Sequence, residues 1–262
     1  MRKIIFKQQG IPQLKEGLLD IKKNYLIMNE RKNKINELAF DNPVSGTVYG
    51  TLLNYEGSFK ELEQKMYEDP YKEPPKAPIL YIKPINTFAS AGSIIPLPSD
   101  VSKVKIGAAL GIVFGKTATK VKEEEALNFV LGYTIVNDVQ IPHTNVYRPA
   151  IKEIARDGFC PIGPWIVKKG FVKNPDSLFI RVAINGDIKQ ENSTANLIRP
   201  IRKLISDVTE FMTLYSGDVL LVGIPECAPL AKAEDHVSIQ IEGIGVLENT
   251  VKKEHSLVGE RL

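Results

Sequence analysis

The side chains suited to covalent chemistry are few and scattered in this sequence. Cys160 is a candidate nucleophile with His143 as its base, because a thiol becomes reactive when a neighbouring group takes its proton. The alternative, which we favour, is that Cys160 is a small buried residue within the segment GFCPIGP. No GxSxG turn is present, and His143, His236 and His255 lack the neighbours that would mark a catalytic triad. Nucleophilic catalysis is therefore not the leading hypothesis.

Motifs for nucleotides, nucleic acids and structural metals are absent as well. No GxGxxG or GxxxxGK[ST] segment follows an expected strand. Cys160 and Cys227 lie far apart, without the spacing of a zinc site or a disulfide framework. The 34 Lys and Arg residues nearly balance 31 Asp and Glu residues, leaving a net charge of +3. This balance argues against a nucleic-acid partner.

The sequence also lacks the apolar segments that a membrane requires. The apolar run near the N-terminus is only residues 4–6, and no segment approaches the ~18 apolar residues of a membrane span. With 43% hydrophobic and 25% charged residues, the composition is that of a globular chain. We therefore expect a cytoplasmic protein without a membrane partner.

Short aliphatic and β-branched segments predict a fold that is mostly β from about residue 46 onward. Asn185-Gly186 predicts a two-residue type I′ hairpin turn, which needs two positive φ angles. Two helices are expected, one over residues 200–215 and one that begins near residue 123 and ends at Gly132. The expected strands cover residues 47–53, 79–82, 110–114, 133–136, 178–184, 219–222 and 237–241.

Residues 1–45 differ from the rest of the chain in their pattern of charged residues. Lysines and arginines are interleaved there with acidic residues, which is typical of a solvated face rather than a binding strip. We expect a small N-terminal element at 1–45, followed by a main domain at 46–262.

Six sequence blocks carry a more specific signal because of their order. They are TLLNYEGSFKELEQ, YKEPPKAPILYIKPINTF, GIVFGKTATKVKEEEALNFVLGYTIVNDV, YRPAIKEIARDGFCPIGPW, VAINGDIKQENSTANLI and EFMTLYSGDVLLVGIP. In this order they resemble the fumarylacetoacetate hydrolase superfamily over about residues 46–251. Several blocks resemble most the first half, or first subunit, of its bifunctional isomerase/decarboxylase branch, which degrades 4-hydroxyphenylacetate.

The resemblance implies a mixed, mainly β fold with a rolled β-sheet core and short flanking helices. It also implies a site where Mg²⁺, Mn²⁺ or Ca²⁺ holds a 2-oxo or 2-hydroxy dicarboxylate substrate. Such a cation stabilises the enolate that forms when a proton moves or carbon dioxide leaves. The implied assembly is a homo-oligomer or a hetero-oligomer with a second family subunit.

The family's cation ligands are only partly retained. The resemblance places one ligand at Asp138, after Asn137, and two glutamates at the positions of Gly107 and Ala109. Neither of these two residues has a side-chain ligand atom. Because hard divalent cations need several oxygen ligands, we expect the cation to bind weakly or not at all. Asp138 itself is expected at the end of a strand, facing a cleft.

Other family positions are also changed. A His-x-x-Glu dyad corresponds to Ser58 and Glu61, which keeps Glu61 as the candidate catalytic proton carrier and loses the base. A family lysine corresponds to Ile154, and a Thr-Gly-Thr-Pro turn corresponds to residues 222–225, which read VGIP. These aliphatic side chains cannot bind a carboxylate.

Three residues remain as candidate substrate-binding groups, and their alternative is a solvated surface charge or a structural role. They are Lys83, Tyr147 and Arg148.

Two classes of function compete. In the first, the chain is a subunit of a 2-hydroxyhepta-2,4-diene-1,7-dioate isomerase / 5-oxopent-3-ene-1,2,5-tricarboxylate decarboxylase with a degenerate metal site. In the second, it is a non-catalytic structural or regulatory partner on the same fold. We favour the first. A metal-free hydrolase using Cys160 or Ser58 is the third alternative.

Overall fold

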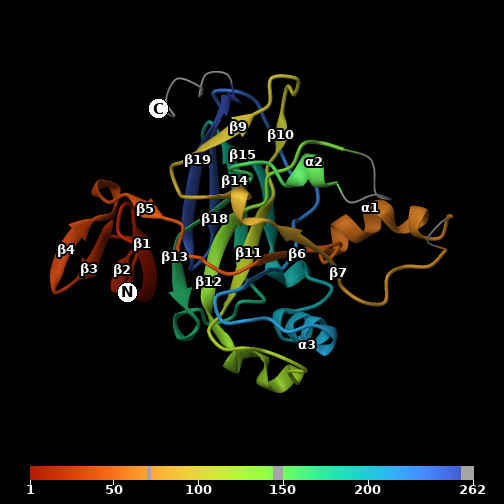
Figure 1. The fold of residues 1–262 in the computed structure, drawn as a ribbon, viewed down its shortest axis with the longest axis horizontal. Coiled ribbons are helices and arrows are strands. Elements are labelled where there is room, and N and C mark those ends of the chain that lie inside the picture. Colours follow the sequence, from red (N-terminus) through yellow and green to blue (C-terminus); the bar gives the residue numbers. More distant parts are fainter. Residues whose placement is uncertain (70–71, 144–149, 255–262) are drawn as a thin grey trace.

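A single large sheet dominates the computed structural model, which describes residues 1–69, 72–143 and 150–254. This 12-stranded sheet has the order β4-β3-β2-β1-β13-β12-β11-β16-β6-β7, with β5 beside β1 and β8 beside β13 (Figure 1). The strands are β1 (Arg2–Gln8), β2 (Leu14–Asp20), β3 (Tyr25–Met28), β4 (Arg31–Lys34), β5 (Phe40–Asp41), β6 (Val48–Leu52), β7 (Ile79–Lys83), β8 (Phe88–Ala89), β11 (Ala108–Phe114), β12 (Val130–Asn137), β13 (Cys160–Lys168) and β16 (Val219–Leu221).

A five-stranded sheet, in the order β15-β14-β18-β19-β9, and the two-stranded pair β10-β17 complete the β structure. Strand β14 alternates buried and more exposed residues, the pattern of a sheet with one face on the core. The largest apolar cluster contains residues of both larger sheets, such as Leu110 and Ile239. These strands are β9 (Ile94–Leu97), β10 (Val104–Lys105), β14 (Phe179–Ile184), β15 (Asp187–Ser193), β17 (Leu230–Ala231), β18 (His236–Ile241) and β19 (Gly245–Lys253).

The helices are short and lie at the periphery (Figure 1). In α3, the residues Ile201, Leu204, Ile205 and Val208 are buried, which is the spacing of one apolar helix face. No helix of the described residues is long and apolar enough to cross a membrane. The helices are α1 (Glu56–Met66), α2 (Ile151–Ile154) and α3 (Ile201–Phe211), with 3₁₀ turns η1 (Ile35–Glu37), η2 (Ile85–Thr87), η3 (Glu123–Asn128), η4 (Lys169–Phe171) and η5 (Thr194–Asn196).

The predicted mainly β fold with short flanking helices is confirmed. All seven expected strands are present, as β6, β7, β11, β12, β14, β16 and β18. The hairpin turn between β14 and β15 is confirmed too, because Asn185 and Gly186 have φ angles of 53° and 85°.

The two predicted helices were wrong in extent. Helix α3 ends at Phe211 because Met212 is extended, and Leu214 bridges to Ala118. The other expected helix is the 3₁₀ turn η3, and β12 begins at Val130. Gly132 belongs to β12, where a Cβ would lie 2.2 Å from the Val167 carbonyl oxygen.

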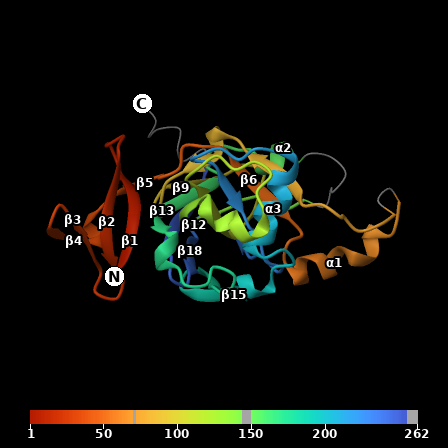
Figure 2. The same ribbon diagram turned by 90° about the horizontal axis from the view of Figure 1, so that it is seen from below.

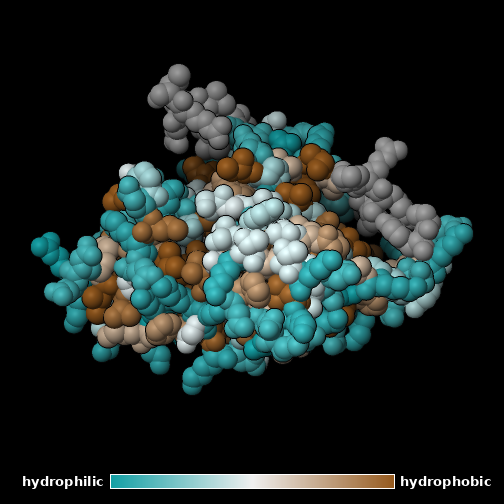
Figure 3. Space-filling view, turned by 60° about the horizontal axis from the view of Figure 1, so that its bottom comes forward, coloured by the Kyte–Doolittle hydropathy of each residue, from teal (hydrophilic) through white to brown (hydrophobic). Residues whose placement is uncertain are grey.

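The N-terminal residues form β1 to β5 and join the large sheet through the antiparallel pair β1 and β13. Phe40 links the two parts, with ring centroids 5.9 Å from Phe6 and 5.3 Å from Trp165. Figure 2 shows that β1–β4 and α1 lie at opposite ends of the molecule. Figure 3 shows hydrophobic and hydrophilic side chains intermixed at the β1–β4 end, and Leu14 and Leu18 of β2 are exposed.

Candidate functional site

Asp138 lies directly after β12, and its position is fixed by the backbone of the neighbouring strand. Its amide donates to the Gly107 carbonyl at 2.8 Å, just before β11. The residue is fully buried. The expected strand end is therefore correct, whereas Asp138 does not face an open cleft because other side chains cover it.

Lys83 is the charged partner of this carboxylate. Its Nζ lies 2.9 Å from Asp138 Oδ1, and both side chains are fully buried. The same ammonium group donates to the carbonyls of Val139 at 3.1 Å and Ile154 at 2.6 Å. Two of the three N–H donors of the ammonium group therefore serve backbone carbonyls, while its charge pairs with Asp138. Lys83 was expected to bind substrate, and in this structure its ammonium group contacts Asp138 and two backbone carbonyls.

Tyr81 covers the other carboxylate oxygen. Two residues before Lys83 in β7, it projects from the same face of the strand and donates its hydroxyl to Asp138 Oδ2. Gln140 Nε2 lies 3.3 Å from the same oxygen. Burial and the nearby Asp138 carboxylate raise the pKa of Tyr81 well above its usual value, so the phenol stays protonated and remains a donor.

Tyr81 was not predicted from the sequence, although its spacing from Lys83 was a usable signal. Its ring needs the glycine opposite it in β6, since a Cβ at Gly50 would lie 2.0 Å from Tyr81 Cζ.

The two positions opposite Asp138 provide no ligand oxygens from side chains. Ala109 is fully buried in β11 and pairs with Val136. A Cβ at Gly107 would lie 2.4 Å from the Asp138 backbone oxygen and 2.7 Å from Ile224 Cδ1. The Ile224 side chain therefore occupies the space into which a longer residue at 107 would extend.

This donor set does not fit a divalent cation. Both Asp138 oxygens already face donors from Lys83 and Tyr81. Within 1–69, 72–143 and 150–254, no group of three or more His, Cys, Asp or Glu residues is placed to hold a metal. A hard cation takes about six to eight oxygen ligands, which these side chains do not supply.

Cys160 adjoins the cluster as a neutral thiol. It is fully buried, and burial, only partly offset by the Lys83 charge, raises the pKa of its thiol to about 12. Since the thiolate is the nucleophile, Cys160 does not suit nucleophilic catalysis at neutral pH.

Glu61 lies on α1. It is exposed, and its Oε1 is 3.8 Å from the Sγ of Cys227. Ser58, one turn earlier, donates to the Ile224 carbonyl at 3.1 Å, so α1 contacts the same loop that closes the space above Gly107. The structure thus unites Lys83 with Asp138 and gives Glu61 other neighbours.

The remaining two candidates, Tyr147 and Arg148, lie outside the described residues.

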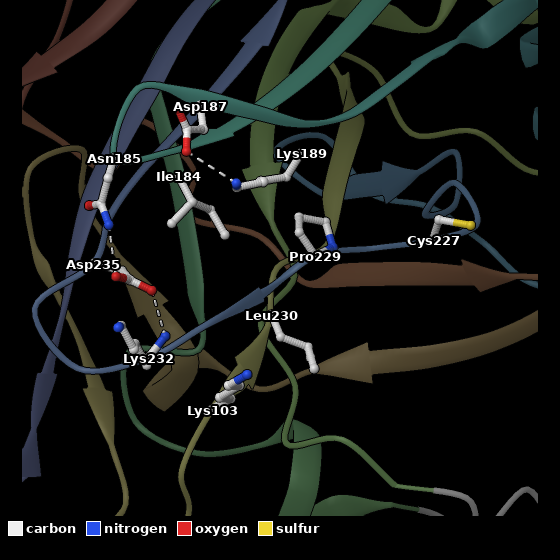
Figure 4. A pocket seen from close by; sticks show the side chains of 10 residues that line it. All are labelled: Lys103, Ile184, Asn185, Asp187, Lys189, Cys227, Pro229, Leu230, Lys232 and Asp235. Carbon is white, nitrogen blue, oxygen red and sulfur yellow. Dashed lines mark hydrogen bonds and ion pairs between the residues drawn. The ribbon is translucent and has the colours of Figure 1, made fainter.

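A surface pocket of about 490 Å³ lies elsewhere (Figure 4). Its acidic groups are already paired, Asp187 with Lys189 at 3.2 Å and Asp235 with Asn185 at 2.9 Å. None of the predicted site residues lines it. The lining residues are Lys103, Ile184, Asn185, Asp187, Lys189, Cys227, Pro229, Leu230, Lys232 and Asp235.

Residues 47–252 match the model of the fumarylacetoacetate (FAA) hydrolase C-terminal family. The chain is 39% identical over 214 residues to the 4-hydroxyphenylacetate degradation bifunctional isomerase/decarboxylase of Escherichia coli. The match covers 82% of this chain and 49% of that protein. This chain therefore spans about half the length of such curated relatives.

Solved structures have the same fold. The 5-carboxymethyl-2-hydroxymuconate delta-isomerase from Mycobacterium smegmatis is 27% identical, with a TM-score of 0.79 and coverage of 97% of this chain and 99% of that one. Maleylpyruvate hydrolase from Sphingobium, in complex with manganese(II) ion and pyruvate, is 19% identical with a TM-score of 0.77, covering 95% and 99% of the two chains. This second likeness shows the fold alone.

Proposed function

This chain belongs to the fumarylacetoacetate hydrolase family, and from that premise we propose that it is one subunit of a 2-hydroxyhepta-2,4-diene-1,7-dioate isomerase / 5-oxopent-3-ene-1,2,5-tricarboxylate decarboxylase. It corresponds to the first half of the bifunctional relative. A second family subunit supplies the cation and most of the chemistry. The 39% identity over about half of the Escherichia coli enzyme supports this assignment.

The observation that supports these separate roles of the two subunits is that Asp138 is buried and already paired. Its charge is compensated by the Lys83 ammonium at 2.9 Å, and Gly107 and Ala109 offer no further ligands. Both proposed reactions pass through an enolate, which needs an electrophile to stabilise it. Losing the main electrostatic stabiliser typically slows such a step by about 10²-fold or more. The chain alone is accordingly a poor catalyst.

Glu61 remains the proposed proton carrier, and Tyr147 and Arg148 the proposed partners of the substrate carboxylates. The exposure of Glu61 leaves it accessible to a substrate or to a partner subunit. These roles apply in the assembled enzyme rather than in the isolated chain.

The test compares the purified chain with a mixture that contains a second family chain carrying the Glu-x-Glu ligands. Loss of the conjugated dienol absorbance of the seven-carbon substrate reports turnover. We expect turnover only after mixing, and a lower rate when the mixture contains Glu61→Gln. The proposal fails if the lone chain turns over at an ordinary enzymatic rate of about 10 per second and Glu61→Gln abolishes that rate.

The alternative is a non-catalytic structural or regulatory partner, and the closed Asp138 position supports this as well. The two differ in one respect. A non-catalytic partner binds the second chain and stabilises it, yet Glu61→Gln then leaves kcat and KM of the mixture unchanged.

A further inference from the structure

We infer that the hydroxyl of Tyr81 and the ammonium of Lys83 together replace the divalent cation at Asp138, so that the carboxylate is held without any metal. This inference rests on the proposed function only in taking Asp138 as the family's cation position. It identifies the groups that occupy the cation position, and it makes Tyr81 a positioning residue.

The first argument concerns charge. A fully buried carboxylate is unstable unless a positive group and hydrogen bonds compensate it. Lys83 supplies the charge at Oδ1, at 2.9 Å, and Tyr81 supplies a donor at Oδ2. Each carboxylate oxygen thus has a partner from the chain itself, and these two partners take the place of a bound cation.

The second argument concerns the segments that the cluster joins. Lys83 ends β7 and binds the carbonyl of Val139, beyond β12, and that of Ile154, the last residue of α2. Tyr81 adds a second link from β7 to Asp138. A metal ion in such a place joins the segments that provide its ligands, and here two side chains of one strand do so.

The third argument concerns space. A cation bound to Asp138 must displace the Tyr81 hydroxyl from Oδ2 or approach Oδ1 beside a fixed ammonium of like charge, which opposes binding. On the opposite side, Ile224 covers Gly107. Direct coordination therefore requires side chains on both sides to move.

The experiment measures thermal unfolding of the isolated chain with EDTA or with millimolar Mn²⁺. A site of micromolar affinity would raise the unfolding midpoint by roughly 5–15 °C under these conditions. We expect a shift below about 1 °C. A rise of several degrees that disappears in Asp138→Asn would overturn the inference, because Mn²⁺ would then occupy the position assigned to the side chains.

Matched variants test the role of Tyr81 directly. Tyr81→Phe removes only the hydroxyl and is expected to lower the midpoint by about 3–10 °C, the range for losing a buried hydrogen bond to a charged group. Tyr49→Phe, on β6, is the control, since Tyr49 is half-buried and its hydroxyl makes no hydrogen bond within the described part of the chain. In the Asp138→Asn background, Tyr81→Phe should lower the midpoint by much less.

The inference would be contradicted if Tyr81→Phe and Tyr49→Phe lowered the unfolding midpoint equally. It would also be contradicted if Tyr81→Phe lowered the midpoint by the same amount with and without Asp138→Asn. These measurements need neither a partner subunit nor substrate. A negative outcome here therefore leaves the mixing experiment intact, and a failure of the mixing experiment leaves this result intact.

Discussion

Removal of the Lys83 ammonium should destabilise the chain far more than removal of an exposed lysine. Lys83→Met keeps an unbranched side chain of similar length but deletes Nζ, which binds Asp138 and two backbone carbonyls. The Asp138 charge then stays buried with only neutral donors around it. Breaking a buried ion pair on one side costs about 3–5 kcal/mol.

The assay is urea unfolding at neutral pH, followed by the fluorescence of Trp165, the single tryptophan and a buried one. For a chain of this size, the expected loss corresponds to a midpoint lowered by about 6–20 °C in a thermal scan. Lys60→Met is the control. Lys60 lies 3.7 Å from Glu56 with most of its side chain exposed, so its removal should cost at most about 0.5 kcal/mol.

The double variant Lys83→Met/Asp138→Asn separates charge from packing. Because both charges are then absent, it should recover at least half of the stability lost in Lys83→Met. The ion-pair argument would be refuted if Lys83→Met lowered the free energy of unfolding by less than about 1 kcal/mol. It would also be refuted if the losses of the two single variants simply added in the double variant.

Three further predictions concern a glycine, the thiols and acid stability. Gly107→Ala should cost about 1–3 kcal/mol because its Cβ would lie 2.4 Å from a backbone oxygen, whereas Gly170→Ala, with open space around it, should be neutral in urea unfolding. At pH 8, a thiol reagent should label the exposed Cys227 at once and the buried Cys160 only on unfolding, and rapid labelling of two thiols would contradict the described burial. Burial favours the neutral form of Asp41, but hydrogen bonds from a lysine, a serine and a backbone amide outweigh it and hold the pKa of this carboxyl below its usual value. The stability that the Asp41 carboxylate contributes is therefore present above about pH 4 and lost as pH falls through the folded pKa. Asp41→Asn should accordingly lose less stability between pH 7 and about pH 3 than the unmodified chain does.

Local sequence patterns predicted the elements that depend on local rules. Short aliphatic and β-branched segments indicated strands such as β14 and β18, and Asn185-Gly186 indicated the hairpin between β14 and β15 because few residue pairs adopt two positive φ angles. The strands β1 to β4 were not predicted. Charged residues interrupt their apolar segments, and β1 is stabilised by pairing with β13, more than 150 residues later in the chain.

The candidate site shows the same division between local and distant information. Family resemblance indicated Asp138, Gly107 and Ala109, which are matters of residue type. It did not indicate Tyr81 or Ile224, because their effects depend on which segments meet. Tyr81 reaches a carboxylate 57 residues away, and Ile224 reaches Gly107 only through the fold of the loop after β16.

The central claim is that this subunit holds no cation at Asp138 and that its partner does. Metal analysis of the purified proteins, after dialysis against Mg²⁺ or Mn²⁺, tests it most directly. The account predicts no stoichiometric metal in the chain alone, and metal in the mixed assembly at the amount carried by the partner, unchanged by Asp138→Asn in this chain. Stoichiometric metal in the isolated chain that is lost with Asp138→Asn would contradict the account.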